Sequence, residues 1–126
     1  MSPDTKNNWL KGKVIKGAQL GRKLGFPTIN LDNPEVMEGF NPGVYASKVK
    51  IEGKIYKGLL YYGPKFIQGE TKNALEIYIL DFDKEIYGQE VVFQITNFIR
   101  PPIKFSDLDL LKKQMNEDLS SVLNKL

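Results

Sequence analysis

The 126-residue sequence contains neither cysteine nor histidine. Without these residue types the chain cannot form disulfides, and it cannot build thiolate nucleophiles, Ser-His-Asp triads or ordinary zinc sites. Acid–base chemistry near neutral pH must therefore use carboxylates, lysine or tyrosine. A metal site must be built from oxygen ligands, which favours magnesium or calcium.

Long apolar runs and dense charged blocks are also missing. No apolar run approaches the length of a membrane span, and Met1–Asn8 lacks the apolar stretch of a signal peptide. The default expectation is therefore a cytoplasmic protein with no membrane partner. The 18 Lys and Arg residues exceed the 15 Asp and Glu residues by a net charge of +3. This excess suits a small anionic ligand, but no cluster is dense enough to argue for nucleic acid, so no nucleic-acid partner is expected.

The chain length favours a single domain over residues 9–126, after a disordered lead-in at residues 1–8. A capping-box pattern at Ser106 and Asp109, followed by an apolar stripe at helical spacing, predicts one helix over residues 106–123. Short apolar segments between turn residues predict six strands, at Trp9–Lys16, Thr28–Leu31, Gly43–Ile51, Lys54–Tyr62, Ala74–Leu80 and Gln89–Ile99. Six short strands and a C-terminal helix predict an all-β fold, a small antiparallel barrel.

The third of these segments changes the phase of its apolar residues. Val44 and Ala46 lie on one face of the predicted strand, whereas Val49 and Ile51 lie on the other. A bulge or sharp bend between them would explain the change. Residues 32–42, which hold two prolines, are expected to form a loop.

The glycine-rich stretch at residues 17–31 combines features that suit a phosphate ligand. Arg22 and Lys23 can reach an anion, and Thr28 and Asn30 share one face of the predicted strand, where two neutral oxygens can help to hold magnesium. A plain surface loop followed by an ordinary strand is the alternative. The stretch matches neither the Gly-x-x-x-x-Gly-Lys-Ser/Thr loop nor the Gly-x-Gly-x-x-Gly fingerprint.

Among the carboxylates, Glu76 stands out because it lies in an apolar strand and shares its face with Tyr78 and Leu80. A solvent-facing strand residue is the usual interpretation of such a glutamate. A partly buried glutamate can instead serve as a general base. Arg100, which follows the sixth strand, can pair with a carboxylate or hold a polar ligand edge.

The order of several motifs resembles that of riboflavin kinases over almost the whole chain. The segment Leu24–Leu31 closely resembles the Gly-x-Pro-Thr-Ala-Asn signature of that family, with Ile29 in place of the alanine. Further segments that resemble family elements are Gly43–Ala46, Leu75-Glu76, Asp81-Phe82, Tyr87-Gly88, Phe98–Pro101 and Lys104-Phe105.

This resemblance implies a six-stranded Greek-key barrel that transfers the γ-phosphate of ATP to the ribityl 5′-hydroxyl of riboflavin and so makes FMN. It implies that Glu76 is the base for the hydroxyl and that Thr28 and Asn30 bind Mg2+. The residues implied in nucleotide binding are Gly17, Arg22, Lys23, Gly25, Pro27 and Thr28. Those implied in flavin binding are Arg100, Ile103 and Phe105. Riboflavin or FMN and ATP or ADP are thus the expected partners of an expected monomer.

One segment departs from the family pattern. Gly58–Gly63 stands where the family often has Gly-Val-Ala-Asn-Ile-Gly, so that Tyr61 replaces an asparagine, and the following Arg-Pro-Thr-Phe is reduced to Pro64–Phe66. A catalytically silent flavin- or nucleotide-binding barrel is therefore the second hypothesis. A nucleic-acid-binding barrel, suggested by charge and fold, is the third. The chain also lacks room for an adenylyltransferase module, so no FAD synthesis is expected.

Overall fold

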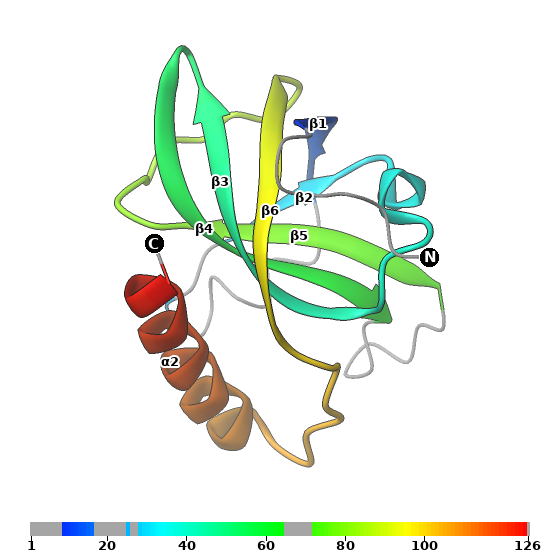
Figure 1. The fold of residues 1–126 in the computed structure, drawn as a ribbon, viewed down its shortest axis with the longest axis vertical. Helices are drawn as coiled ribbons and strands as arrows, with labels where there is room; N and C mark the ends of the chain where they lie inside the picture. Colours follow the sequence, from blue (N-terminus) through cyan, green and yellow to red (C-terminus); the bar gives the residue numbers. More distant parts are fainter. Residues whose placement is uncertain (1–8, 17–24, 26–27, 65–71, 126) are drawn as a thin grey trace.

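The computed structural model describes residues 9–16, 25, 28–64 and 72–125, in which six strands close into one barrel (Figure 1). In chain order they are β1 (Leu10–Ile15), β2 (Thr28–Leu31), β3 (Gly43–Ile51), β4 (Lys54–Pro64), β5 (Asn73–Ile79) and β6 (Glu90–Arg100). Around the barrel the order is β1-β2-β5-β4-β3-β6, with antiparallel neighbours throughout. The consecutive strands β3, β4 and β5 are neighbours in the sheet, and the chain then crosses back so that β6 pairs with β3. This topology is a Greek key, which confirms the expected fold.

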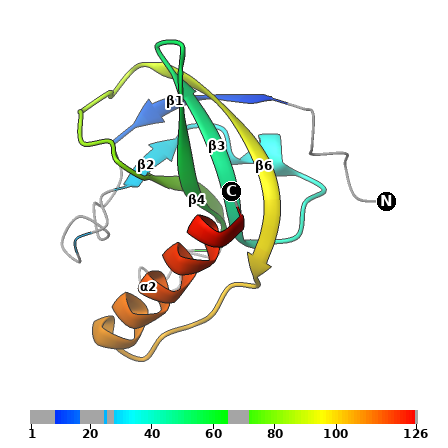
Figure 2. The same cartoon turned by 60° about the vertical axis from the view of Figure 1, so that its left-hand side comes forward.

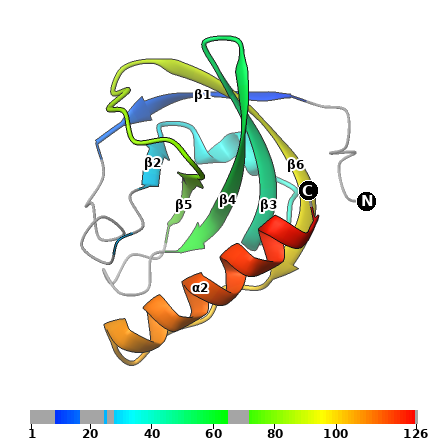
Figure 3. The same cartoon turned by 90° about the vertical axis from the view of Figure 1, so that its left-hand side faces the viewer.

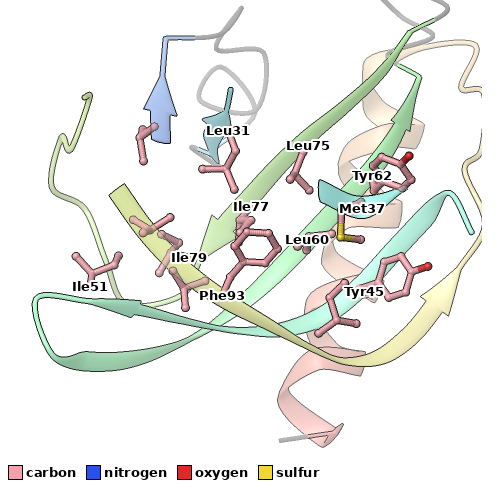
Figure 4. Close-up of a cluster of buried hydrophobic side chains, with 14 of the residues drawn as sticks. Leu31, Met37, Tyr45, Ile51, Leu60, Tyr62, Leu75, Ile77, Ile79 and Phe93 are labelled. Atoms are coloured by element: carbon pink, nitrogen blue, oxygen red, sulfur yellow. The ribbon is translucent and has the colours of Figure 1, made fainter. Parts of the chain in front are cut away.

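Strand residues of alternate positions fill the inside of the barrel, as the apolar pattern predicts. Leu75, Ile77 and Ile79 of β5 meet Phe93 of β6 there, each at most 3% exposed (Figure 4). The predicted loop at residues 32–42 contains a short 3-10 helix, η1 (Pro34–Met37), which begins on a proline. Burial of the Met37 side chain in the same core explains why this segment is ordered into a helical turn.

The apolar residues of β3 lie on different faces in its two halves. The sequence predicted a bulge or bend in the strand to explain this, but the structure shows another cause. The register between β3 and β4 is continuous from Gly43 to Ile51, so the strand alternates regularly. Val44 and Ala46 lie on the outer face of the barrel. They are buried there because they belong to a second apolar cluster, which includes Val122 of the C-terminal helix. The irregular pairings lie between β3 and β6, where β6 carries an extra residue at two points.

The helix α2 (Leu108–Lys125) lies outside the barrel, against β3, β4 and β6 (Figures 2 and 3). The expected cap at Ser106 is wrong by one residue. The Asp107 carboxylate accepts a hydrogen bond from the Leu110 backbone N–H at 2.9 Å and thus satisfies one of the free donors of the first turn. No helix in the described part of the chain combines the length and apolar character needed to cross a membrane.

Candidate functional site

The candidate residues from three distant parts of the sequence meet in one pairing row on the outer face of the barrel. Asn30 of β2 lies directly opposite Glu76 of β5, and Glu76 lies opposite Tyr61 of β4. Tyr61 in turn pairs with Val44 of β3, which pairs with Arg100 of β6. Directly opposed residues on antiparallel strands project from the same face. The predicted base, a predicted metal ligand and a predicted flavin contact therefore share this surface.

Thr28 and Asn30 also share the outer face, because the residues between and after them, Ile29 and Leu31, contact the core. Two positions apart on a strand, their Cα atoms are separated by roughly 6–7 Å, which allows both side-chain oxygens to approach one ion. Neutral oxygens suit magnesium, which takes its remaining ligands from water and substrate phosphates. The donor set therefore fits the expected ion. Asn30 is 8% exposed, so its amide is held largely away from solvent.

Glu76 is partly buried, which fits the second of the two interpretations given to it from the sequence. It lies between Asn30 on one neighbouring strand and Tyr61 on the other. Among the described residues no three carboxylates gather into a metal cluster. Glu76 is the carboxylate that the pairing row places next to Asn30, and a positioned carboxylate of this kind can accept a proton from a bound hydroxyl.

Tyr61 stands between the two charged members of the row. Burial raises the pKa of its phenol to about 12; the Glu76 carboxylate adds to the rise and the Arg100 guanidinium opposes it. Its hydroxyl donates a hydrogen bond to the Pro64 carbonyl oxygen. A Cβ atom at Gly63 would lie only 2.9 Å from that hydroxyl, so the neighbouring glycine gives the phenol its room. The phenol is therefore neutral near pH 7 and held in one place.

Arg100 joins the barrel to α2 through a carboxylate. Its Nε and Nη2 atoms donate to the two oxygens of Asp118 at 2.9 and 2.8 Å, a two-pronged arrangement. Asp118 is 2% exposed and also accepts a hydrogen bond from Gln114 at 3.0 Å. This pairing confirms one of the two expectations for Arg100. It fixes the end of β6 to the helix and so orients the segment that follows.

That segment carries the other two predicted flavin contacts. The Arg100 guanidinium carbon lies 5.9 Å from the centre of the Phe105 ring, within the range of a cation–π contact. Phe105 is partly buried, whereas 43% of Ile103 is exposed. The segment 101–105 thus presents aromatic and aliphatic surface beside a fixed cation, which suits a flat ring with a few polar edges.

A cavity of about 140 Å³ opens beside the first residue of β2. Thr28, Ile77 and Ile79 contribute to its wall, and Phe82 and Tyr87 of the β5–β6 connection contribute aromatic surface. The same connection supplies three charged residues to the lining, Asp83, Lys84 and Glu85. The aromatic and aliphatic wall suits a flat heteroaromatic ring.

Most of the predicted nucleotide contacts lie outside the described residues. These are Gly17, Arg22, Lys23 and Pro27. Gly25 is described: it is exposed and has a φ of 88°, a left-handed conformation that favours glycine. Its position just before Thr28 is consistent with the predicted role.

Asp118 was not among the site residues predicted from the sequence. A signal was present, since Asp118 falls between Met115 and Val122 in the apolar stripe of the helix, where an unpaired carboxylate would be costly. Tyr61 was noted in the sequence only because it replaces an asparagine of the riboflavin kinase pattern. Its place between Glu76 and Arg100 depends on cross-strand register, which no local pattern reveals.

Comparisons with known proteins identify relatives of this chain. The chain is 37% identical over 117 residues to the RNA-binding riboflavin kinase of Bacillus subtilis, covering 92% of this chain and 50% of that protein. It is 38% identical over 113 residues to the bifunctional riboflavin kinase/FMN adenylyltransferase of Haemophilus influenzae, covering 87% of this chain and 36% of that protein. The chain thus spans half or less of the length of these curated relatives.

The fold is shared with a solved structure as well. The riboflavin kinase of Trypanosoma brucei superposes with a TM-score of 0.65 at 25% sequence identity, over 92% of this chain and 77% of that one. The model of the riboflavin kinase (Flavokinase) family matches residues 5–126. A match over nearly the whole chain, together with the Greek-key barrel, establishes that the chain belongs to the riboflavin kinase family.

Proposed function

We propose that this chain phosphorylates riboflavin at its ribityl 5′-hydroxyl with ATP and so forms FMN. The observation that carries the proposal is the pairing of Asn30 with Glu76 on the same outer face as Thr28. This pairing gathers the expected base and the expected metal ligands into one place. Membership of the riboflavin kinase family supports the same reaction.

In the proposed reaction the 5′-hydroxyl of riboflavin gives its proton to the Glu76 carboxylate. A bond forms between the hydroxyl oxygen and the γ-phosphorus of ATP, and the bond from that phosphorus to the β–γ bridging oxygen breaks. ADP leaves with the electron pair of the broken bond. Such a transfer needs positioning and charge stabilisation more than covalent catalysis, which fits a site without cysteine or histidine.

Thr28 and Asn30 would hold Mg2+, which when bound supplies charge neutralisation for the ATP phosphates. We place the nucleotide base in the cavity lined by Phe82 and Tyr87, because Thr28, one of the two proposed metal ligands, also lines that cavity. The phosphates then extend over the outer face towards Glu76. Gly17, Arg22, Lys23, Gly25 and Pro27 would contact the nucleotide from the glycine-rich stretch.

The isoalloxazine ring belongs on the segment that follows β6. Phe105 and Ile103 supply the apolar surface, and Arg100 is fixed beside them by Asp118. In this arrangement the flavin ring lies near α2 and the ribityl chain points along the row towards Glu76. The two substrates thus approach the carboxylate from opposite ends of the same pairing row.

A direct test is to incubate the protein with riboflavin, ATP and Mg2+ and to separate the flavins by chromatography. FMN formation that requires both ATP and protein is the expected result. Riboflavin binding without any FMN would favour the catalytically silent barrel, which the substitution of Tyr61 for the family's asparagine suggests. Absence of both binding and product would contradict the proposal.

A further inference from the structure

We propose that the part of the barrel wall left uncovered by α2 is a binding surface for single-stranded nucleic acid. This surface, here called the lysine face, is formed by side chains of β1, β3 and β4 and by Trp9, which precedes β1. It consists of Trp9, Lys11, Lys13, Lys48, Lys50 and Lys57. The proposal rests on the arrangement of these residues and does not depend on the proposed kinase activity.

Strand register brings these lysines together although they are scattered in the sequence. Lys50 of β3 lies opposite Val92 of β6, and Val92 lies opposite Lys11 of β1. Lys48, two residues before Lys50, lies opposite Lys57 of β4. Val49 and Ile51 point into the core. Lys48 and Lys50 therefore point outward, and so do the residues opposite them.

Two of these charges repel each other. Directly opposed side chains on antiparallel strands have Cβ atoms roughly 4.5–5.5 Å apart, and like charges in such a pair are destabilising. Neither Lys48 nor Lys57 forms an ion pair with any residue that the structure describes. By register, Glu90 lies opposite Lys13. The Asp32 carboxylate accepts a hydrogen bond from the Lys13 backbone N–H at 3.2 Å, so both of these acidic residues lie beside Lys13. A bound polyanion would compensate the repulsion between Lys48 and Lys57.

The lysine face also includes aromatic surface. Trp9 is 38% exposed, and the Lys50 ammonium nitrogen lies 5.2 Å from the centre of its ring. Ile55, opposite Lys50, is 52% exposed. Single-stranded nucleic acid combines repeated phosphates with flat bases that stack on aromatic side chains. An exposed ring among cations fits that ligand better than it fits an anionic membrane surface, which has no flat groups to stack.

The cations of the lysine face are all lysines, which contact phosphate as point charges and lack the two-pronged geometry of arginine. Phosphate contacts and base stacking carry little sequence information. Binding is therefore expected to depend weakly on nucleotide sequence and strongly on salt.

The lysine face is separate from the candidate active site. It extends towards the turn between β3 and β4, whereas α2 and the end of β6 lie at the other end of these strands (Figure 3). Glu76, Asn30 and Arg100 belong to the latter end. Substitutions of Lys48, Lys50 and Lys57, which lie nearer that turn, should therefore leave FMN formation unchanged.

The primary test is fluorescence anisotropy of a labelled oligouridylate titrated with the full chain at several salt concentrations. Each phosphate neutralised on a single strand contributes a slope of about −0.7 in log affinity against log salt, so contacts from five lysines give up to about −3.5. Trp9 is the only tryptophan. Its fluorescence therefore reports on this surface alone, and quenching by unlabelled RNA is expected.

The variant Lys48→Gln/Lys57→Gln should weaken RNA binding at least tenfold while keeping the melting temperature. The control Lys112→Gln/Lys113→Gln removes the same charge from exposed positions on α2 and should change affinity less than twofold. Lys11→Gln/Lys50→Gln provides a second pair if the first fails to fold. The proposal is overturned if RNA affinity falls equally in the lysine-face and control variants, or if it stays unchanged in the lysine-face variants. It is also overturned if the protein binds no RNA at low salt. Binding to phosphatidylserine vesicles without binding to RNA would also overturn it.

Discussion

Asn30 and Glu76 lie directly opposite each other on β2 and β5, although they belong to motifs far apart in the sequence. The pair places a neutral oxygen ligand beside a carboxylate on the outer face of the barrel. In the proposed reaction Asn30 helps to hold Mg2+ while Glu76 takes the proton of the riboflavin hydroxyl. These roles predict different effects of substitution at the two positions.

Glu76→Gln should lower FMN formation by ~10²–10⁴-fold, the usual contribution of a positioned general base. The melting temperature and Mg-ADP binding should stay close to those of the unchanged protein, because glutamine keeps the size of the side chain. Glu117→Gln, which makes the same chemical change at an exposed position of α2, is the control. Nearly full turnover in the Glu76 variant would assign this residue a structural role.

Thr28 and Asn30 should determine how strongly magnesium adds to nucleotide binding. ADP with Mg2+ is expected to raise the melting temperature more than ADP alone, because ligands of the folded state stabilise it. Thr28→Ala and Asn30→Ala should each shrink that magnesium increment, whereas Thr28→Ser keeps a hydroxyl and should preserve it. An increment of normal size in both alanine variants would rule out this metal site.

Phe105→Ala should weaken riboflavin binding by about tenfold, or ~1.4 kcal/mol, through loss of the aromatic wall beside Arg100. Quenching of riboflavin fluorescence in the presence of Mg-ADP measures this affinity. Phe98→Ala deletes an aromatic ring that packs on Tyr45 instead, and it is expected to leave riboflavin affinity unchanged. If Phe105→Ala binds normally, Tyr61 is the next candidate for the wall, because Tyr62 is only 7% exposed and contacts the core.

Loss of either partner of the Arg100–Asp118 ion pair should destabilise the fold. Asp118 is 2% exposed, so Arg100→Leu leaves a buried carboxylate without its cation, and a cost of ~3–5 kcal/mol is expected in chemical denaturation. The double variant Arg100→Leu/Asp118→Leu should lose clearly less than the sum of the two single variants. Additive losses would show that the two side chains do not stabilise the fold as a pair.

The raised pKa of Tyr61 predicts a specific loss of stability at alkaline pH. Because the pKa is about 12 in the folded chain and 10 in the reference state, the unfolded chain loses this proton first as pH rises. The resulting stabilisation is complete below pH 10 and disappears as pH rises through about 12. Tyr61→Phe should therefore show a shallower decline in unfolding free energy across this window. Tyrosinate absorbance of the two proteins should also differ there, and identical titrations would contradict the assignment.

Local patterns in the sequence predicted the six strands and the C-terminal helix. Apolar alternation in β5 and β6 located both strands to within one residue at each end, because side chains of a strand point alternately to its two faces. Glu52 and Gly53 adopt φ values of 51° and 81°, as a two-residue hairpin turn requires. The family motifs also identified Thr28, Asn30, Glu76 and Arg100 as candidates before their positions were known.

The contacts between distant residues could not be predicted from local patterns. The opposition of Asn30 and Glu76, the ion pair of Arg100 with Asp118, and the approach of Lys48 to Lys57 all join segments that are separated in the sequence. The covering of Val44 and Ala46 by α2, in place of a bend in β3, has the same origin. Local patterns report which way a side chain points from its own strand. Register and closure depend on the packing of all six strands at once, so the site formed between strands becomes visible only in the closed barrel.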